Sequence, residues 1–128
     1  MSAKQRIAIV DDDASVRRAL ARYLLACSFE AESFGSGAEF LFSLPAFKPH
    51  CIVLDLHMEG MNGLQVQSRL TEMVCRIPVV VITGHDSASD REKSMKLGAG
   101  AFLLKPVNGH LLLTTVRQLI TACPDVSA

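Results

Sequence analysis

Short runs of apolar residues recur along the chain and are separated by longer, amphipathic stretches. Four runs, at residues 7–10, 51–54, 79–82 and 101–104, consist largely of Val, Ile, Leu and Ala. Apolar runs of this length, bounded by polar or glycine-containing loops, are typical of buried β-strands. Residues 30–34 form a short, less apolar run, which we expect to be an edge strand.

Between these runs, apolar residues recur every three or four positions, the spacing of one face of an amphipathic helix. This spacing predicts five helices, over about residues 16–24, 37–44, 64–74, 87–97 and 111–120.

Polar and helix-breaking residues mark several of the expected helix ends. Residues 36–39 (Ser-Gly-Ala-Glu) have the pattern of a capping box. Asn108 is placed to cap the last helix, and Gly98 suits the position just after the fourth. Pro45 and Pro49 are expected to bracket a loop before the third strand.

The alternation of strand and helix patterns predicts five β-α units in an α/β fold. Four strands are apolar throughout, as expected when helices cover both faces of a parallel sheet. The pattern alone does not fix the strand order. The flavodoxin-like (βα)5 three-layer sandwich, with order 2-1-3-4-5, would put a switch point between strands one and three. We expect a single domain over residues 1–128, with its core at about 5–122 and a frayed tail after 123.

Composition and charge narrow the class of protein. The 128 residues suffice for one core, and a formal net charge of zero gives no general drive toward nucleic acid or anionic membrane. No apolar stretch approaches the roughly 20 residues of a transmembrane helix, and the first residues do not resemble a signal peptide. The four cysteines, Cys27, Cys51, Cys75 and Cys123, form no C-x-x-C pair and are interpreted as small hydrophobes in a reducing cytosol. We therefore expect a cytoplasmic protein that contacts neither membrane nor nucleic acid directly.

Polar residues with matching chemistry follow four of the predicted strands. Asp55 ends the third apolar run, and the first run leads into three acids at residues 11–13. Thr83 and Lys105 follow the fourth and fifth runs. Each residue alone is better explained as a helix cap, a turn or a solvated loop, and Asp13 is expected to be a cap. Their joint occurrence on four successive strands favours one functional site, because open α/β sheets bind ligands at the carboxyl ends of their strands.

The chemistry of such a site follows from its charges. Carboxylates of Asp11, Asp12 and Asp55 at close range would repel, which raises a pKa or recruits a cation, and an oxygen-rich cluster of this size suits Mg²⁺. Asp55 would then be free to act as a nucleophile toward phosphorus. Thr83 offers a hydroxyl and Lys105 an ammonium group to the phosphoryl oxygens, and such transfer depends mainly on positioning and charge neutralisation.

The order and spacing of these motifs resemble one known family. The matching segments are residues 10–13 (Val-Asp-Asp-Asp), 53–58 (Val-Leu-Asp-Leu-His-Met), 60–63 (Gly-Met-Asn-Gly), 81–85 (Val-Ile-Thr-Gly-His), 97–102 (Leu-Gly-Ala-Gly-Ala-Phe) and 104–106 (Leu-Lys-Pro). Over about residues 5–122 the chain resembles a response-regulator receiver domain of bacterial two-component signalling. It most resembles receivers that precede helix-turn-helix transcription domains of the nodulation and nitrogen-fixation type.

The resemblance implies a role for each strand-end residue. Asp55 would take a phosphoryl group from the phosphohistidine of a sensor histidine kinase or phosphotransfer protein, and the domain would catalyse its own phosphorylation and dephosphorylation. Asp12 and Asp55 would bind Mg²⁺ directly, with Asp11 acting through water and the backbone carbonyl of His57 as a further ligand. Mn²⁺ can substitute for Mg²⁺ in such a site. Thr83 and Lys105 would hold the phosphoryl group.

The resemblance also implies a switch and an output surface. Phe102 lies at the aromatic switch position and would turn inward as Thr83 moves toward the phosphate, and a cis peptide is expected before Pro106. The output face would comprise the fourth helix, fifth strand and fifth helix, and could mediate homodimerisation. Candidate surface residues are Met95, Lys96, Phe102, Thr114 and Arg117.

One position departs from the family pattern. Glu59 stands where the family usually has proline, which removes a rigid turn residue and adds an acid near the pocket. Its side chain is expected either to alter the loop and the metal site or to point into solvent. His57 and His85 occupy positions that either gate water near Asp55 or line the rim.

Two other classes of protein remain as alternatives. An Mg²⁺-dependent aspartyl-phosphate phosphohydrolase would also use a strand-end Asp, Thr and Lys, but its nucleophile usually follows the first strand and a cap segment covers the substrate. A flavin-binding electron carrier would need a hydroxyl- and glycine-rich loop after the first strand, where this chain has acids that repel phosphate.

Overall fold

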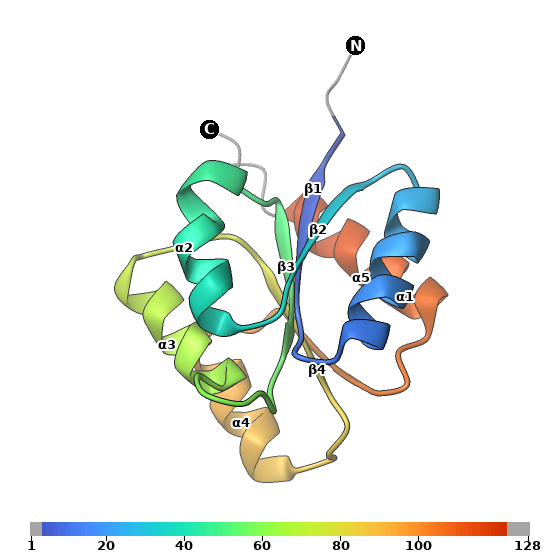
Figure 1. Ribbon diagram of the computed structural model, residues 1–128. Helices are drawn as coiled ribbons and strands as arrows, with labels where there is room; N and C mark the ends of the chain where they lie inside the picture. Colours follow the sequence, from blue (N-terminus) through green and yellow to red (C-terminus); the bar gives the residue numbers. More distant parts are fainter. Residues whose placement is uncertain (1–3, 123–128) are drawn as a thin grey trace.

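Strands and helices alternate through residues 4–122, which the computed structural model describes (Figure 1). The strands are β1 (Arg6–Val10), β2 (Glu30–Phe34), β3 (Cys51–Asp55), β4 (Val79–Thr83) and β5 (Ala101–Leu104). The helices are α1 (Ala14–Ala26), α2 (Gly37–Phe47), α3 (Gly63–Glu72), α4 (Ala88–Lys96) and α5 (Gly109–Ala122). All the strand pairs are parallel and the sheet order is β2-β1-β3-β4-β5, which confirms the predicted flavodoxin-like arrangement.

The helices lie in two layers, with α1 and α5 on one face of the sheet and α2, α3 and α4 on the other (Figure 1). Successive residues of a strand point to opposite faces. Ile7 and Ile9 of β1 accordingly pack under α1 and α5, whereas Ala8 and Val10 pack under α2 and α3. All five residues of β3 and of β4 are buried, as predicted for strands covered on both sides.

Three helices end in the same local motif. After α1, α3 and α4, the third residue beyond the helix donates its N–H to a carbonyl five positions back: Phe29 to Leu24, Cys75 to Leu70 and Ala99 to Ser94. This is the Schellman motif, which requires a left-handed residue just before that donor. Gly98 fills this position after α4 with φ +98°, as predicted.

Two expectations about helix ends are wrong. Pro45 does not open a loop, because α2 continues to Phe47 while Leu44 and Phe47 pack against the core. That packing outweighs the one helical hydrogen bond that proline cannot donate. The third helix ends at Glu72, with Met73 as its cap and Val74 in the left-handed conformation at φ +54°. Both side chains are exposed.

The helix starts agree with the sequence, except that the hydrogen bonds of the described residues include only the Ser36 half of the predicted capping box. Asp13 and Ser87 accept hydrogen bonds from the first turns of α1 and α4, and the Ser36 hydroxyl accepts one from the Glu39 N–H at 3.1 Å. The Asn108 side chain caps α5 through the N–H of Leu111 at 2.9 Å. No helix within residues 4–122 is both long and apolar enough to cross a membrane. The expected tail, with Cys123, lies outside the described residues.

Candidate functional site

The strand register brings the polar strand ends to one edge of the sheet. Val10 pairs with Leu54, and Asp55 pairs with Ile82, so the first residue after β1 and the last residue of β3 are neighbours. One carboxylate oxygen from each of Asp11, Asp12 and Asp55 lies within 4.8 Å of the others. This cluster occupies the point where strand order reverses, between β1 and β3, as the sequence predicted.

Lys105 extends from the end of β5 to the same cluster. Its Nζ lies 2.9 Å from Asp11 Oδ2 and 3.4 Å from Asp55 Oδ1. Burial alone would lower the pKa of Lys105, but the hydrogen bond and charge of Asp11 and the charge of Asp55 outweigh burial, and the pKa is raised. The ammonium group is therefore fixed as a cation between two carboxylates.

Asp55 is the acid of this site whose ionised form is disfavoured by its surroundings. Its side chain is buried, and burial together with the charge of Asp11 raises its pKa to about 6, even though Lys105 acts in the opposite direction. The single positive charge of Lys105 does not balance the negative charges of Asp55 and the two acids beside it. The pocket therefore favours either a proton on Asp55 or a further cation.

Main-chain and side-chain hydrogen bonds fix the acids in place. Asp11 Oδ1 accepts from the N–H of Asp13 at 2.9 Å, and the guanidinium of Arg17 donates to the Asp11 carbonyl at 2.7 Å. Asp12 Oδ2 accepts from the N–H of Glu59 at 3.2 Å. Asp13 itself is the helix cap that the sequence predicted, and its hydrogen bonds from Ser15 lower its pKa.

The Thr83 hydroxyl lies at the next strand end and is buried. Its oxygen accepts the N–H of His85 at 3.1 Å, and the N–H of Lys105 donates to the Thr83 carbonyl at 2.8 Å. The register of β4 and β5, in which Thr83 pairs with Leu104, thus ties the hydroxyl residue to the lysine. The peptide between Lys105 and Pro106 is cis, as expected.

Phe102 lies under α4 with 8% of its surface exposed, packed on the same core face as α2 and α3. It is therefore not part of the exposed output surface on which we expected it, because β5 directs this ring toward the core. The guanidinium carbon of Arg91 lies 4.7 Å from the centre of the Phe102 ring, the geometry of a cation–π contact.

Arg17, Arg91 and the contact of Asp90 with His57 were not anticipated from the sequence, whereas His57 and His85 were. Arg17 reaches Asp11 from α1, and Arg91 reaches Phe102 from α4; the sequence pattern does not specify the side-chain directions of either helix. His57 Nε2 lies 3.5 Å from Asp90 Oδ2, and the His57 and His85 rings stack edge to face with centres 5.2 Å apart. The two histidines therefore line the exposed rim and connect the loop after β3 with α4.

The three carboxylates fit a divalent cation. Mg²⁺ is bound by oxygen atoms at about 2.1 Å in octahedral geometry, often through one or two carboxylates and several waters. Oxygen atoms within 4.8 Å of one another are close enough to share such an ion after small side-chain adjustments. Burial, followed by the charge of Asp11, raises the pKa of Asp55, and a cation bound in the cluster would offset both effects.

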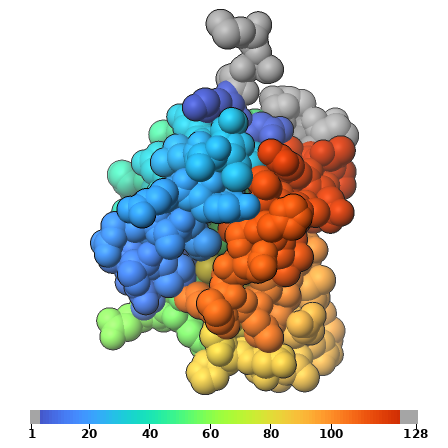
Figure 2. Space-filling model, turned by 90° about the vertical axis from the view of Figure 1, so that its right-hand side faces the viewer, coloured from blue at the N-terminus to red at the C-terminus, as the bar shows by residue number. Residues whose placement is uncertain are grey.

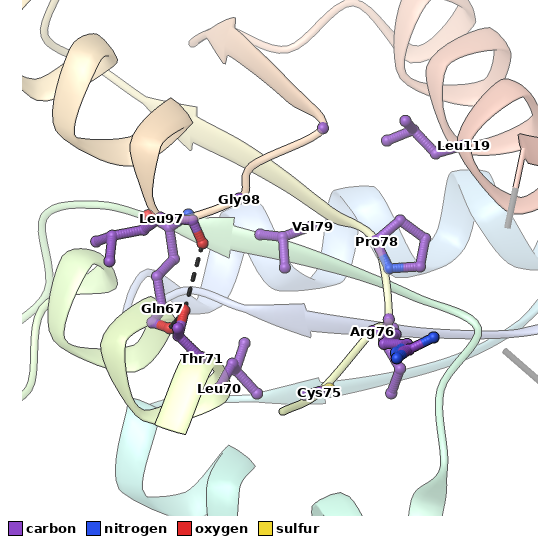
Figure 3. Close-up of a pocket in the computed structure, with 12 residues that line it drawn as sticks. Gln67, Leu70, Thr71, Cys75, Arg76, Pro78, Val79, Leu97, Gly98 and Leu119 are labelled. Atoms are coloured by element: carbon purple, nitrogen blue, oxygen red, sulfur yellow. Dashed lines mark hydrogen bonds between the residues drawn. The ribbon is translucent and has the colours of Figure 1, made fainter. Parts of the chain in front are cut away.

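A separate hollow lies at the opposite edge of the sheet, where β4 and β5 begin (Figure 3). It encloses about 250 Å³ between α3, α5 and the segments that precede β4 and β5. Thr71 bridges it through a long hydrogen bond of 3.5 Å to the Leu97 carbonyl. None of the strand-end acids lines this hollow, so it is not part of the candidate site.

The fold and the site define an α/β protein with an acidic centre at the switch point of a parallel sheet. Residues 7–117 match the family model of the response regulator receiver domain, and the chain belongs to this family. It is a receiver domain of two-component response regulators, signalling proteins that take phosphoryl groups from histidine kinases.

Individual relatives agree with this assignment. The chain is 36% identical over 115 residues to Nodulation protein W of Bradyrhizobium diazoefficiens, covering 90% of this chain and 51% of that protein. It is 32% identical over 120 residues to Transcriptional regulatory protein FixJ of the same organism, covering 94% and 58%. The crystal structure of FixJ-N superimposes with a TM-score of 0.86 at 29% identity, covering 94% of this chain and 96% of that one. The chain thus spans little more than half the length of these two curated relatives, and the predicted resemblance is confirmed.

Proposed function

We propose that Asp55 is the phosphoryl acceptor of this receiver domain. The observation that carries the proposal is the pairing of a buried, under-neutralised Asp55 with Lys105 Nζ at 3.4 Å, beside two further acids. This arrangement gives a carboxylate oxygen with high free energy and a fixed cation next to it. Bond formation to phosphorus relieves the negative charge of the buried Asp55, and the adjacent Lys105 cation can neutralise charge on the phosphoryl oxygens.

The acidic cluster would hold Mg²⁺ through Asp11, Asp12 and Asp55, with the backbone carbonyl of His57 as a further ligand. When bound, the ion would neutralise the charge of the phosphoryl oxygens and of the acids around them. The chain's own contribution is to position these oxygens and to keep the Lys105 ammonium between Asp11 and Asp55.

The transfer step forms one bond and breaks one. An oxygen of Asp55 attacks the phosphorus of a phosphohistidine, the P–N bond breaks, and the released imidazole nitrogen takes a proton from solvent. Lys105 moves from Asp55 toward the phosphoryl oxygens. The Thr83 hydroxyl, whose oxygen accepts the N–H of His85, retains its proton for donation to a phosphoryl oxygen.

The donor protein would approach over α1 and the segment after β5, which lie side by side in Figure 2. A hollow of about 320 Å³ opens there between Ser15, Val16, Ala19 and Leu20 of α1 and Lys105, Pro106 and Val107. It is lined mainly by apolar side chains and reaches the lysine that contacts Asp55. These features suit a helix that presents a phosphohistidine to the site.

The output would leave through α4, β5 and α5. Phosphorylation adds a charge of about −1.5 to −2 and three acceptor oxygens next to Thr83. Movement of Thr83 would act on Phe102, which packs under Arg91 of α4. Met95, Leu104 and Leu111 are 44%, 43% and 50% exposed on this face and support a role in phosphorylation-promoted homodimerisation. FixJ is a transcriptional regulatory protein, and this chain matches 58% of its length.

A phosphohydrolase is the second candidate, and the family match does not favour it. The two functions differ in what happens to a small phosphoryl donor. With Mg²⁺ and acetyl phosphate, we expect at most one phosphoryl group per wild-type chain and none on Asp55→Asn. Asp13→Asn, which alters an acid two residues from Asp11 that caps a helix, should be phosphorylated normally. Continuous turnover of phosphate esters would support the hydrolase instead.

A further inference from the structure

Glu59, which stands where the family usually has proline, donates a hydrogen bond to the acidic cluster. The main-chain N–H of Glu59 lies 3.2 Å from Asp12 Oδ2, across 47 positions of sequence. Within residues 4–122 this is the one hydrogen bond that the Asp12 side chain receives. The Glu59 side chain itself is exposed, so the chain's contact at this position is made by the backbone.

The loop that carries this N–H is anchored on both sides. Met58 is 8% exposed and belongs to the core beneath α2 and α3. Gly63 donates its N–H to the Leu56 carbonyl at 2.9 Å, which closes the loop, and Gly60 takes a left-handed φ of +74°. The direction of the Glu59 N–H is therefore set by packing that does not involve the acids.

Asp12 needs such a restraint more than its neighbours do. Asp11 and Asp55 are buried and contact Lys105, whereas Asp12 is exposed. A hydrogen bond to Oδ2 restricts rotation of the carboxylate and leaves its other oxygen available to a ligand. Groups that orient a metal ligand in this way typically change metal affinity by about 10–100-fold when removed.

We propose that Glu59 is a positioning residue for the divalent cation and acts through its main-chain N–H, not through its carboxylate. The inference rests on the metal site proposed above. Any residue except proline supplies this donor, so a proline at position 59 removes a contact that this chain possesses.

A matched pair of variants separates the backbone from the side chain. Glu59→Ala keeps the N–H and removes the carboxylate, whereas Glu59→Pro removes both. Mg²⁺ affinity is measured by isothermal titration calorimetry, and Mn²⁺ affinity by electron paramagnetic resonance. We expect Glu59→Ala to stay within about threefold of wild type and Glu59→Pro to bind about tenfold more weakly. Equal affinities of the two variants would overturn the inference, while a wild-type chain that binds neither ion would instead refute the proposed metal site.

A second measurement does not depend on a proline being tolerated in the loop. Amide hydrogen exchange of Glu59 reports its hydrogen bond directly in the metal-free protein. In Asp12→Ala, we expect the Glu59 amide to exchange at least about tenfold faster than in wild type. In Asp13→Asn its rate should be unchanged. Equal exchange rates in Asp12→Ala and wild type would show that no such bond holds Asp12.

Discussion

At the scale of single residues, the folded protein disfavours the ionised form of Asp55. Its pKa of about 6 lies above the ordinary value of 3.8 because of burial and the charge of Asp11. An acid whose pKa is higher in the folded protein than in the unfolded chain destabilises the fold once it is ionised. The destabilisation is absent below about pH 4 and complete above about pH 7, given this shift.

Asp55→Asn is therefore expected to stabilise the metal-free protein at about pH 7.5, by roughly 1–3 kcal/mol, and to have little effect at about pH 4. Urea unfolding in the presence of a chelator at the two pH values tests this difference. Asp13→Asn is the control with the opposite sign, because hydrogen bonds from Ser15 lower the pKa of Asp13. Equal stability of wild type and Asp55→Asn at both pH values would contradict the electrostatic description of the site.

Removing the charge of Lys105 is expected to destabilise the metal-free protein, whereas removing the charge of Asp55 stabilises it. Lys105→Met keeps most of the apolar side chain but leaves Asp11 and Asp55 without their shared cation. Removing one partner of a fully buried ion pair costs about 3–5 kcal/mol; because Lys105 is only partly buried, we expect a smaller loss of about 1–3 kcal/mol in the metal-free variant near neutral pH. Adding Asp55→Asn to Lys105→Met should restore much of the loss, which double-mutant unfolding experiments would measure. Additive effects of the two changes would argue against a shared site.

The strand-end residues could be predicted from the sequence because parallel strands end at a common edge. Asp11, Asp55, Thr83 and Lys105 each follow an apolar run, so their proximity follows from the fold class alone. The contacts of Arg17, Arg91 and the Glu59 N–H could not be predicted in this way. They depend on helix rotation and loop conformation, which the spacing of apolar residues does not determine.

At the scale of elements, the connection between β3 and α3 positions the acceptor. A Cβ atom at Gly63, the first residue of α3, would lie 2.5 Å from the Asp55 carbonyl oxygen and 2.7 Å from Leu56 Cα. The start of α3 is thus packed directly on the backbone of the acceptor strand, and only glycine allows this approach.

Gly63→Ala is accordingly expected to destabilise the protein by about 1–3 kcal/mol, because the helix or the strand end must shift to make room. It should also slow phosphorylation, since Asp55 would move relative to Lys105. Gly84→Ala is the matched control for stability, as its Cβ would meet nothing within 4 Å. Thermal unfolding of the two variants side by side tests the expectation, and equal stability would contradict it.

Helix boundaries show where element prediction fails and why. The end of α4 was predictable because Gly98 marks a left-handed position, whereas α3 ends in the same motif with Val74 there. Nothing in the local sequence indicates that a β-branched residue takes this conformation. Pro45 predicted a helix end too early, because it lies inside α2, where core packing extends the helix.

At the scale of the whole molecule, the site and the output face share α4. His57 in the loop after β3 contacts Asp90, and Arg91 covers Phe102 of β5. Ser94 is the one buried residue within Ala88–Lys96, so few apolar contacts hold this helix to the sheet. A helix attached mainly through polar side chains can be displaced by a local change of charge at modest cost.

We expect this change to promote association through the α4-β5-α5 face. With Mg²⁺ and beryllium fluoride, a stable phosphoryl mimic, sedimentation equilibrium should show a dimer, and without it a monomer. Met95→Lys, on the exposed side of α4, should prevent the dimer. Phe42→Lys, on the outer side of α2 with 89% of the side chain exposed, should not. A monomer in all samples would contradict dimerisation through this face while leaving the acceptor assignment intact.

The central claim is that Asp55 carries the phosphoryl group, and chemical trapping tests it most directly. The protein is phosphorylated with acetyl phosphate and Mg²⁺, reduced with borohydride, and digested for mass spectrometry. Reduction converts an aspartyl phosphate to homoserine, so the modified residue is identified within its peptide. We predict homoserine at position 55, absent when Mg²⁺ is chelated. Homoserine at position 11, 12 or 13, or modification of no aspartate, would contradict the claim.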